Sequence, residues 1–270
     1  MRILPANNNF SFGKNKYIKK GDDIQRRVKS QIPAFSPLYA SVYYKTANNK
    51  DNLKQYNRSN YYLMRKQDEL RENRDEIRDL ISTGIITDYY NATMQRMASS
   101  KLANCEEQSI ATVAALAMNG FKDARREMLY IKSEFINKET GEIEYVAKSS
   151  LDHTFVTSAL GKEIKSDDER FVLDSWLGFC DTTEGAKQRF KELSEKRDLY
   201  SFRIQDHFID FKYRKFGQER ESVNPDNYEQ KVEIYFEPYD FEPKRVAEKI
   251  AEFSEISFPS LRINNSTDKL

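Results

Sequence analysis

The chain has 270 residues, of which 39% are apolar and 32% charged, and its 44 basic and 43 acidic side chains leave a formal net charge of +1. A nearly neutral chain gives no support to nucleic-acid binding, for which a basic surface is typical. The sequence has no apolar run of 18 residues, which excludes a membrane-spanning helix.

The chain contains two cysteines, Cys105 and Cys180. Because they are far apart, they do not indicate a disulfide scaffold, and a reducing compartment is expected. The first 20 residues lack the continuous apolar stretch of a cleaved signal peptide. We therefore expect a cytosolic protein or one that is exported without such a signal.

Residues 1–58 are expected to form a flexible leader with some docked segments, because Asn and Lys clusters alternate there with short apolar patches. The range 59–260 is expected to form the main domain as a single compact unit, with residues from 184 onward as an elaboration of it or, alternatively, as a separate recognition module. The range 261–270 is expected to be a tail. Within the main domain, apolar residues at helical spacing predict an amphipathic helix over 62–81: Leu63, Leu70, Ile77 and Ile81.

A second helix is predicted to begin at Cys105. Asn104 is among the preferred N-cap residues, and Glu107 follows three positions later, as in a capping box. The alanine-rich run after these residues is apolar enough to lie in a core, and Gly120 is a plausible end.

The pattern then changes to a period of two, which predicts strands. The candidate strands are 128–135, 143–146, 153–160, 171–174, 209–213 and 232–236. Two further helices are predicted over 184–199 and 243–256. Helices first, then a mostly antiparallel sheet with more helices, indicate an α+β fold.

Cys105 is the first candidate for chemistry. The N-terminus of a helix favours a thiolate, and its backbone N–H groups can hold a developing oxyanion. The alternative is a small, buried and inert cysteine. Two acids come directly after it, and a nearby negative charge disfavours a thiolate. Glu107 is explained as the capping partner, whereas the sequence suggests no role for Glu106.

A nucleophilic thiol needs a base, and the base needs an orienting acceptor. If the strand that begins at His153 and the strand that ends at Asp174 form a hairpin, opposed residue numbers that sum to 327 place these two side chains next to each other. Taken singly, His153 is an ordinary loop-edge histidine and Asp174 a strand-end cap. His207 is interpreted as a structural histidine and as the second choice for the base.

The remaining candidates indicate no cofactor. Cys180 is interpreted as an inert apolar residue. The chain has no Cys or His pair at zinc-ligand spacing and no glycine-rich phosphate loop, so neither a metal nor a nucleotide is expected.

Taken together, these residues resemble the Cys–His–Asp enzymes of the papain-like and transglutaminase-like superfamily. The similar motifs are Asn-Cys-Glu-Glu-Gln-Ser at the head of a helix, His-Thr-Phe-Val from His153, and Val-Leu-Asp-Ser-Trp-Leu-Gly from Val172. More narrowly, their order is similar to that in secreted effectors of pathogenic bacteria. The resemblance covers roughly Leu102 to Phe179, under a third of the chain.

The resemblance implies a papain-like fold, in which a cysteine-headed core helix packs on the sheet. It implies that Cys105 is the nucleophile, His153 the general base and Asp174 the orienting acid. It also implies that Trp176 shields the His–Asp pair from water, with a plain core indole as the alternative. The implied partner is a protein substrate, such as a protein of a host cell. The implied localisation is export by a bacterial system into a reducing host cytosol, with the bacterial cytoplasm as the alternative.

The sequence departs from the papain pattern at the oxyanion hole. That pattern has a glutamine shortly before the cysteine, where this chain has Ser99, whereas Gln95 lies farther upstream. The Asn104 side chain and the Cys105 backbone N–H are the other candidates. The expected activity is thiol-dependent acyl transfer at protein amide bonds, first as a cysteine protease, with glutamine deamidase and transglutaminase as alternatives. The rival is a non-enzymatic protein that binds a host protein through its C-terminal sheet.

Overall fold

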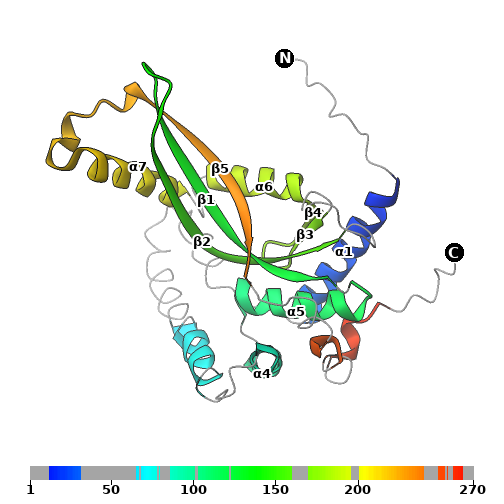
Figure 1. The fold of residues 1–270 in the computed structure, drawn as a ribbon. Helices are drawn as coiled ribbons and strands as arrows, with labels where there is room; N and C mark the ends of the chain where they lie inside the picture. Colours follow the sequence, from blue (N-terminus) through cyan, green and yellow to red (C-terminus); the bar gives the residue numbers. More distant parts are fainter. Residues whose placement is uncertain are drawn as a thin grey trace, which may run out of the picture.

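The computed structural model describes residues 12–31, 65–66, 68–77, 79, 86–100, 103–121, 123–159, 170–195, 201–239, 249–252, 254 and 258–263. These residues form helices packed around an antiparallel sheet, so the predicted α+β class is confirmed (Figure 1). No helix within these ranges is both long and apolar enough to cross a bilayer.

The described residues build a five-stranded sheet in the order β4-β3-β2-β1-β5 (Figure 1). Every neighbouring pair is antiparallel. The strands are β1 Arg125–Asn137, β2 Ile143–Ala159, β3 Arg170–Asp174, β4 Phe179–Thr182 and β5 Tyr228–Pro238. The predicted break between strands 143–146 and 153–160 is wrong, because both belong to the single strand β2.

A bulge explains how β2 continues through the polar stretch that suggested a loop. Met128 of β1 pairs with Thr154 of β2, and Tyr130 pairs with Ser150. Three β2 residues, 151–153, therefore lie opposite a single β1 residue. Such bulges bend a strand locally and change the direction of a side chain. The candidate base His153 is the last residue of this bulge.

Three helices contribute to the core on one face of the sheet: α1 Phe12–Gln31, α4 Ile86–Ser100 and α5 Cys105–Met118. The side chains of Ile24 and Val28 in α1 are fully buried, so the range expected to be a leader supplies part of this core. Leu261, in the range expected to be a tail, is also fully buried. Of the helix predicted over 62–81, the described residues 65–66, 68–77 and 79 are helical, and both ends of the predicted range lie outside the described residues.

Two helices cover the other face: α6 Thr183–Glu195, through Phe190, and α7 Ser201–Phe216, whose Phe211 stacks on Phe135 of β1 with ring centroids 4.4 Å apart. The strand predicted over 209–213 is therefore wrong. Phe211 is fully buried, whereas Ile209 and Tyr213 are 64% and 61% exposed. This alternation comes from a helix whose apolar residues lie on both of its sides, a pattern that a short segment shares with a strand.

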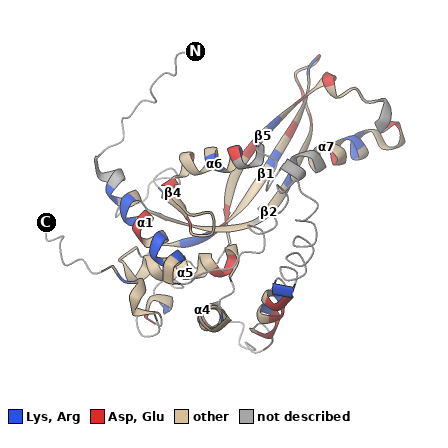
Figure 2. Cartoon of the chain, turned by 180° about the vertical axis from the view of Figure 1, so that it is seen from behind, with Lys and Arg blue, Asp and Glu red and all other residues tan. Residues whose placement is uncertain are grey.

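The remaining described elements are short. They are the 3-10 helices η2 Gly217–Ser222, η3 Pro225–Asn227 and η4 Pro259–Leu261. Of the helix predicted over 243–256, residues 249–252 are helical, and most of the rest lies outside the described residues. Basic and acidic residues are interspersed along β1, β5 and α7, in line with the near-neutral charge of the chain (Figure 2).

Candidate active site

Cys105 is the first residue of α5, as the sequence predicts. Asn104 precedes it in an extended conformation and donates its backbone N–H to Glu107 Oε2 at 2.7 Å. Intrahelical bonding begins at Gln108, whose N–H donates to the Asn104 carbonyl at 3.0 Å. The backbone N–H groups of residues 105–107 therefore lie in the part of a helix that attracts negative charge. The Cys105 side chain is 7% exposed at this position.

His153 and Asp174 meet beside this helix start. His153 Nε2 lies 2.6 Å from Asp174 Oδ2, and both residues are buried, at 2% and 1% exposure. Asp174 Oδ1 accepts the backbone N–H of Leu177 at 2.8 Å, so both carboxylate oxygens are used. The turn closes when Gly178 N–H donates to the Asp174 carbonyl at 2.7 Å. Gly178 has φ +82°, a conformation that glycine adopts without strain.

The register predicted for this hairpin is wrong by two residues. Opposed residues in β2 and β3 sum to 329, as in Val156 with Leu173 and Ala159 with Arg170, and not to 327. Side chains alternate between the faces of a sheet with a period of two, so a slip of two residues leaves each one on its original face. The two side chains are therefore diagonal neighbours in place of directly opposed ones, and they remain in hydrogen-bond contact.

The Cys105 thiol forms a hydrogen bond with the His153 side chain. Because Nε2 faces the carboxylate, Nδ1 is the ring nitrogen left for the sulfur. Burial lowers the pKa of His153, but the charge of Asp174, its hydrogen bond and the interactions with Cys105 outweigh burial and raise the pKa to about 10. The ring is thus a protonated imidazolium near neutral pH, which is the partner that a thiolate requires.

Aromatic rings surround the histidine. The Trp176 ring centroid lies 5.2 Å from that of His153, and those of Phe190 and Phe155 lie at 5.8 and 6.1 Å. Trp176 is 6% exposed, so its indole lies both in the core and against the imidazole. This position is therefore compatible with both roles considered for Trp176, shielding of the His–Asp pair from water and packing in the core.

A buried pair of hydroxyls connects α5 to the turn that carries Asp174. Thr112 Oγ1 lies 2.6 Å from Ser175 Oγ and donates to the Gln108 carbonyl at 2.7 Å. Because that carbonyl takes the Thr112 proton, Ser175 is the donor between the two hydroxyls. This bond fixes the helix that begins at Cys105 relative to the residue next to Asp174.

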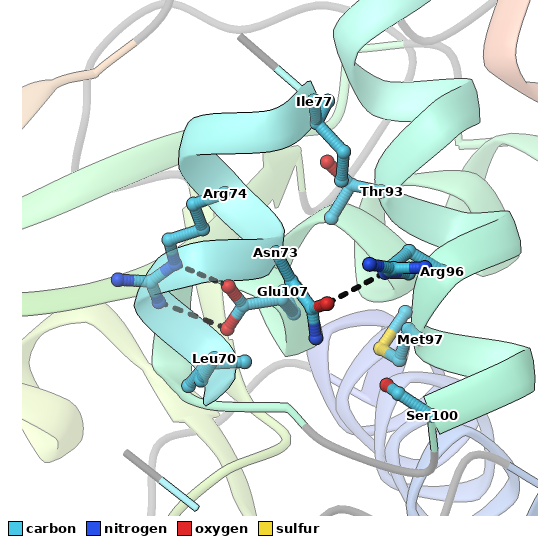
Figure 3. A pocket seen from close by; sticks show the side chains of 9 residues that line it. All are labelled: Leu70, Asn73, Arg74, Ile77, Thr93, Arg96, Met97, Ser100 and Glu107. Atoms are coloured by element: carbon cyan, nitrogen blue, oxygen red, sulfur yellow. Dashed lines mark hydrogen bonds and ion pairs between the residues drawn. The ribbon is translucent and has the colours of Figure 1, made fainter. Parts of the chain in front are cut away.

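Two side chains that the sequence did not suggest contact the start of α5. Arg74, in the helical segment 68–77, pairs with Glu107, and its Nε lies 3.5 Å from Glu106 Oε2. Tyr89 of α4 donates its hydroxyl to Glu106 Oε1 at 3.0 Å. The separation of 33 residues between Arg74 and Glu107 leaves no signal in the sequence. Figure 3 shows this ion pair at the edge of a small pocket between the helical segment, α4 and α5.

The other candidates lie apart from this constellation. Gln95, an oxyanion candidate, is on the exposed side of α4. His207 is buried in α7, where its two ring nitrogens contact the hydroxyls of Ser133 and Ser149 at 2.8 and 2.7 Å. Burial, followed by the charges of Asp22 and Asp181, raises the pKa of Cys180, an environment that disfavours a thiolate.

Within the described ranges, no cluster of three or more His, Cys, Asp or Glu side chains is placed to hold a metal ion. In comparisons with known proteins, no family model, no curated protein and no solved structure matches the chain. The function of the chain is therefore inferred from the geometry and chemistry of the site around Cys105.

Proposed function

We propose that this protein is a thiol-dependent enzyme that cleaves amide bonds of proteins through Cys105, His153 and Asp174, with peptide-bond hydrolysis as the first activity to assay. The observation that carries the proposal is the continuous hydrogen-bonded series from a thiol at a helix start, through a buried imidazole, to a buried carboxylate. A thiol, a base within hydrogen-bond reach and an orienting acid are the parts that nucleophilic catalysis needs.

The proposed reaction has two steps. The Cys105 thiolate attacks the carbonyl carbon, and the backbone N–H groups at the start of α5 stabilise the oxyanion. The C–N bond breaks as His153 gives its proton to the departing nitrogen, which leaves a thioester on Cys105. Water then attacks the thioester while His153 accepts its proton, and the C–S bond breaks to release the acid product and restore the thiolate–imidazolium pair. Throughout, Asp174 keeps His153 in the tautomer and orientation that these transfers require.

The amide that is attacked and the molecule that accepts the acyl group from Cys105 together define the activity. Attack on a backbone amide followed by water gives a protease, and attack on a glutamine side chain followed by water gives a deamidase. An amine in place of water gives a transglutaminase. The resemblance to bacterial secreted effectors further predicts a host protein as substrate and export without a cleaved signal, into a reducing cytosol.

Alkylation of the native protein by iodoacetamide tests the proposal without a known substrate. We expect selective modification of Cys105 at pH 6.5, read by mass spectrometry of peptides, with Cys180 as the internal comparison. Cys180→Ala should keep the rapid reaction and Cys105→Ala should lose it. If Cys105 reacts no faster than an ordinary thiol, the enzyme proposal fails and the non-enzymatic binding protein is the better interpretation.

Substrate assays then separate the three activities. Wild-type protein and Cys105→Ala are incubated with mixed denatured proteins, and new N-termini, released ammonia and incorporation of a labelled amine are measured in parallel. New N-termini that require Cys105 identify a protease. Ammonia without cleavage identifies a deamidase, and amine incorporation a transglutaminase.

A further inference from the structure

The start of α5 presents an electrostatic conflict. Glu106 and Glu107 come directly after the nucleophile, and Glu107 is only 3% exposed. Negative charges this close to a sulfur disfavour its thiolate, and burial limits how far solvent can screen them. A reactive thiol at this position therefore needs a compensating positive charge beyond the helix start itself.

Arg74 supplies such a charge from a different part of the chain. Its Nη2 donates to Glu107 Oε2 at 3.0 Å, its Nε pairs with Glu107 Oε1, and the same Nε lies 3.5 Å from Glu106 Oε2. Figure 3 shows the two-pronged contact between Arg74 and Glu107. A bidentate guanidinium–carboxylate pair fixes both position and orientation. Because Glu107 Oε2 also accepts the Asn104 N–H at 2.7 Å, Arg74 holds the carboxylate that caps the nucleophile's helix.

The guanidinium is also coupled to the sulfur. Burial works against the charged form of Arg74, but the hydrogen bond to Glu107 and the charges of Glu107, Glu106 and Cys105 outweigh burial and raise its pKa. A cation this close to the start of α5 also attracts negative charge that develops there. The other ionisable groups identified around this thiol are His153 and Asp174 on the sheet and Tyr89 on α4, which bonds to Glu106.

We propose that Arg74 is a positioning residue of the candidate active site, which offsets the two glutamates after Cys105 and so raises the reactivity of the nucleophile. This inference rests on the proposed function. It adds a residue that acts on the nucleophile through Glu106 and Glu107, from a helical segment outside the sheet and α5. The charge of Arg74 and its two carboxylate partners sums to −1, and substitutions at Arg74 and Glu107 change this sum in opposite directions.

The experiment is a charge-counting series in the Cys180→Ala background. The rate of Cys105 alkylation by iodoacetamide is measured from pH 5 to pH 10 in the parent and in three variants. Arg74→Met makes the local charge −2, Glu107→Gln makes it 0, and the double variant returns it to −1. We expect the midpoint of the pH profile to rise by roughly 1 unit in Arg74→Met, to fall by a similar amount in Glu107→Gln, and to return to the parent value in the double variant.

Arg96→Met is the matched control. Arg96 lines the same pocket, where it bonds to Asn73 Oδ1 at 2.6 Å (Figure 3). Its carboxylate partner is Glu76, and not Glu107. Its loss removes a cation from the same region without changing the carboxylates beside Cys105. We expect the midpoint in Arg96→Met to stay within a few tenths of a unit of the parent.

A merely structural role for Arg74 gives a different result. Thermal unfolding midpoints would then fall while all pH midpoints stayed equal, which overturns the inference. If Arg74→Met does not fold, Glu107→Gln and the double variant still differ only in the Arg74 charge, and equal midpoints for these two overturn the inference as well. Failure of the proposed function looks different again, because Cys105 of the parent is then unreactive.

Discussion

Asp174→Asn is the substitution that tests the catalytic constellation most directly. It removes the negative charge that faces His153 Nε2 at 2.6 Å and preserves the shape of the side chain. The rise in the pKa of His153 from 6.5 to about 10 corresponds to about 5 kcal/mol in favour of the protonated ring, at about 1.4 kcal/mol per unit. Burial opposes that protonation, and the charge of Asp174 is the largest influence in its favour. The variant should therefore lose most of its imidazolium near neutral pH.

The size of the effect depends on the thiolate that the imidazolium supports. An ordinary thiol, with a pKa of about 8.5, is only about 1% ionised at pH 6.5. A cysteine paired with an imidazolium has a lowered pKa, and most of it is thiolate at that pH. We therefore expect iodoacetamide to alkylate Cys105 up to about 100-fold more slowly in Asp174→Asn at pH 6.5, with the difference closing near pH 9.

The assay measures loss of the free thiol by mass spectrometry across this pH range, in the Cys180→Ala background. Asp210→Asn makes the same chemical change on α7, where Asp210 bonds to Tyr145 and Arg214, and should leave the profile of Cys105 unchanged. Circular dichroism verifies that each variant is folded. Superimposable profiles for folded Asp174→Asn and its parent would refute the assignment of Asp174 as the group that holds His153 in its charged form.

Three further predictions concern stability. Thr112→Val leaves the buried Ser175 hydroxyl without its acceptor and should lower the free energy of unfolding in urea by about 1–3 kcal/mol. Ser175→Ala leaves Thr112 bonded to the Gln108 carbonyl and should lower it by only about 1 kcal/mol. An equal loss in both variants would contradict Ser175 as the donor. The pKa of His153 is raised from 6.5 to about 10 in the folded state. The stability that His153 contributes is therefore complete below pH 6.5 and is lost as the pH rises through about 10. Urea midpoints of the wild type should decline over this pH range, and those of His153→Gln should decline less. His207→Leu should lower the urea midpoint, because the buried Ser133 hydroxyl and the half-buried Ser149 hydroxyl lose their contacts with the ring. Cys105 alkylation should stay unchanged, and a loss of alkylation would instead support His207 as the base.

Local chemistry was sufficient to predict the start of α5. The cap at Asn104, the acid at Glu107 and the apolar run after them are neighbours in sequence, so their interactions depend on few other residues. The structure places the first helical residue at Cys105, as expected. Local patterns also located much of β1 and β5, in which more buried and more exposed residues alternate, and of β3, whose five residues are all buried.

The predicted proximity of His153 and Asp174 holds although the strand register on which it was based is wrong. The assumed register was wrong by two residues, yet the period of a strand is also two, so both side chains kept their face. A one-residue error would have separated them. In contrast, the alternation over 209–213 suggested a strand, because a segment of a few residues with apolar side chains on both sides of a helix has the same pattern.

What the sequence determined by itself is therefore local: the α+β class, the cap and start of the cysteine helix, and the three side chains that are candidates for chemistry. Only the tertiary structure decided what surrounds them. Arg74 reaches Glu107 across a sequence separation of 33 residues, and α1 joins the core from a stretch whose composition is typical of a leader. Such contacts are made when elements distant along the chain pack together, and a local pattern carries no record of which element will be the neighbour.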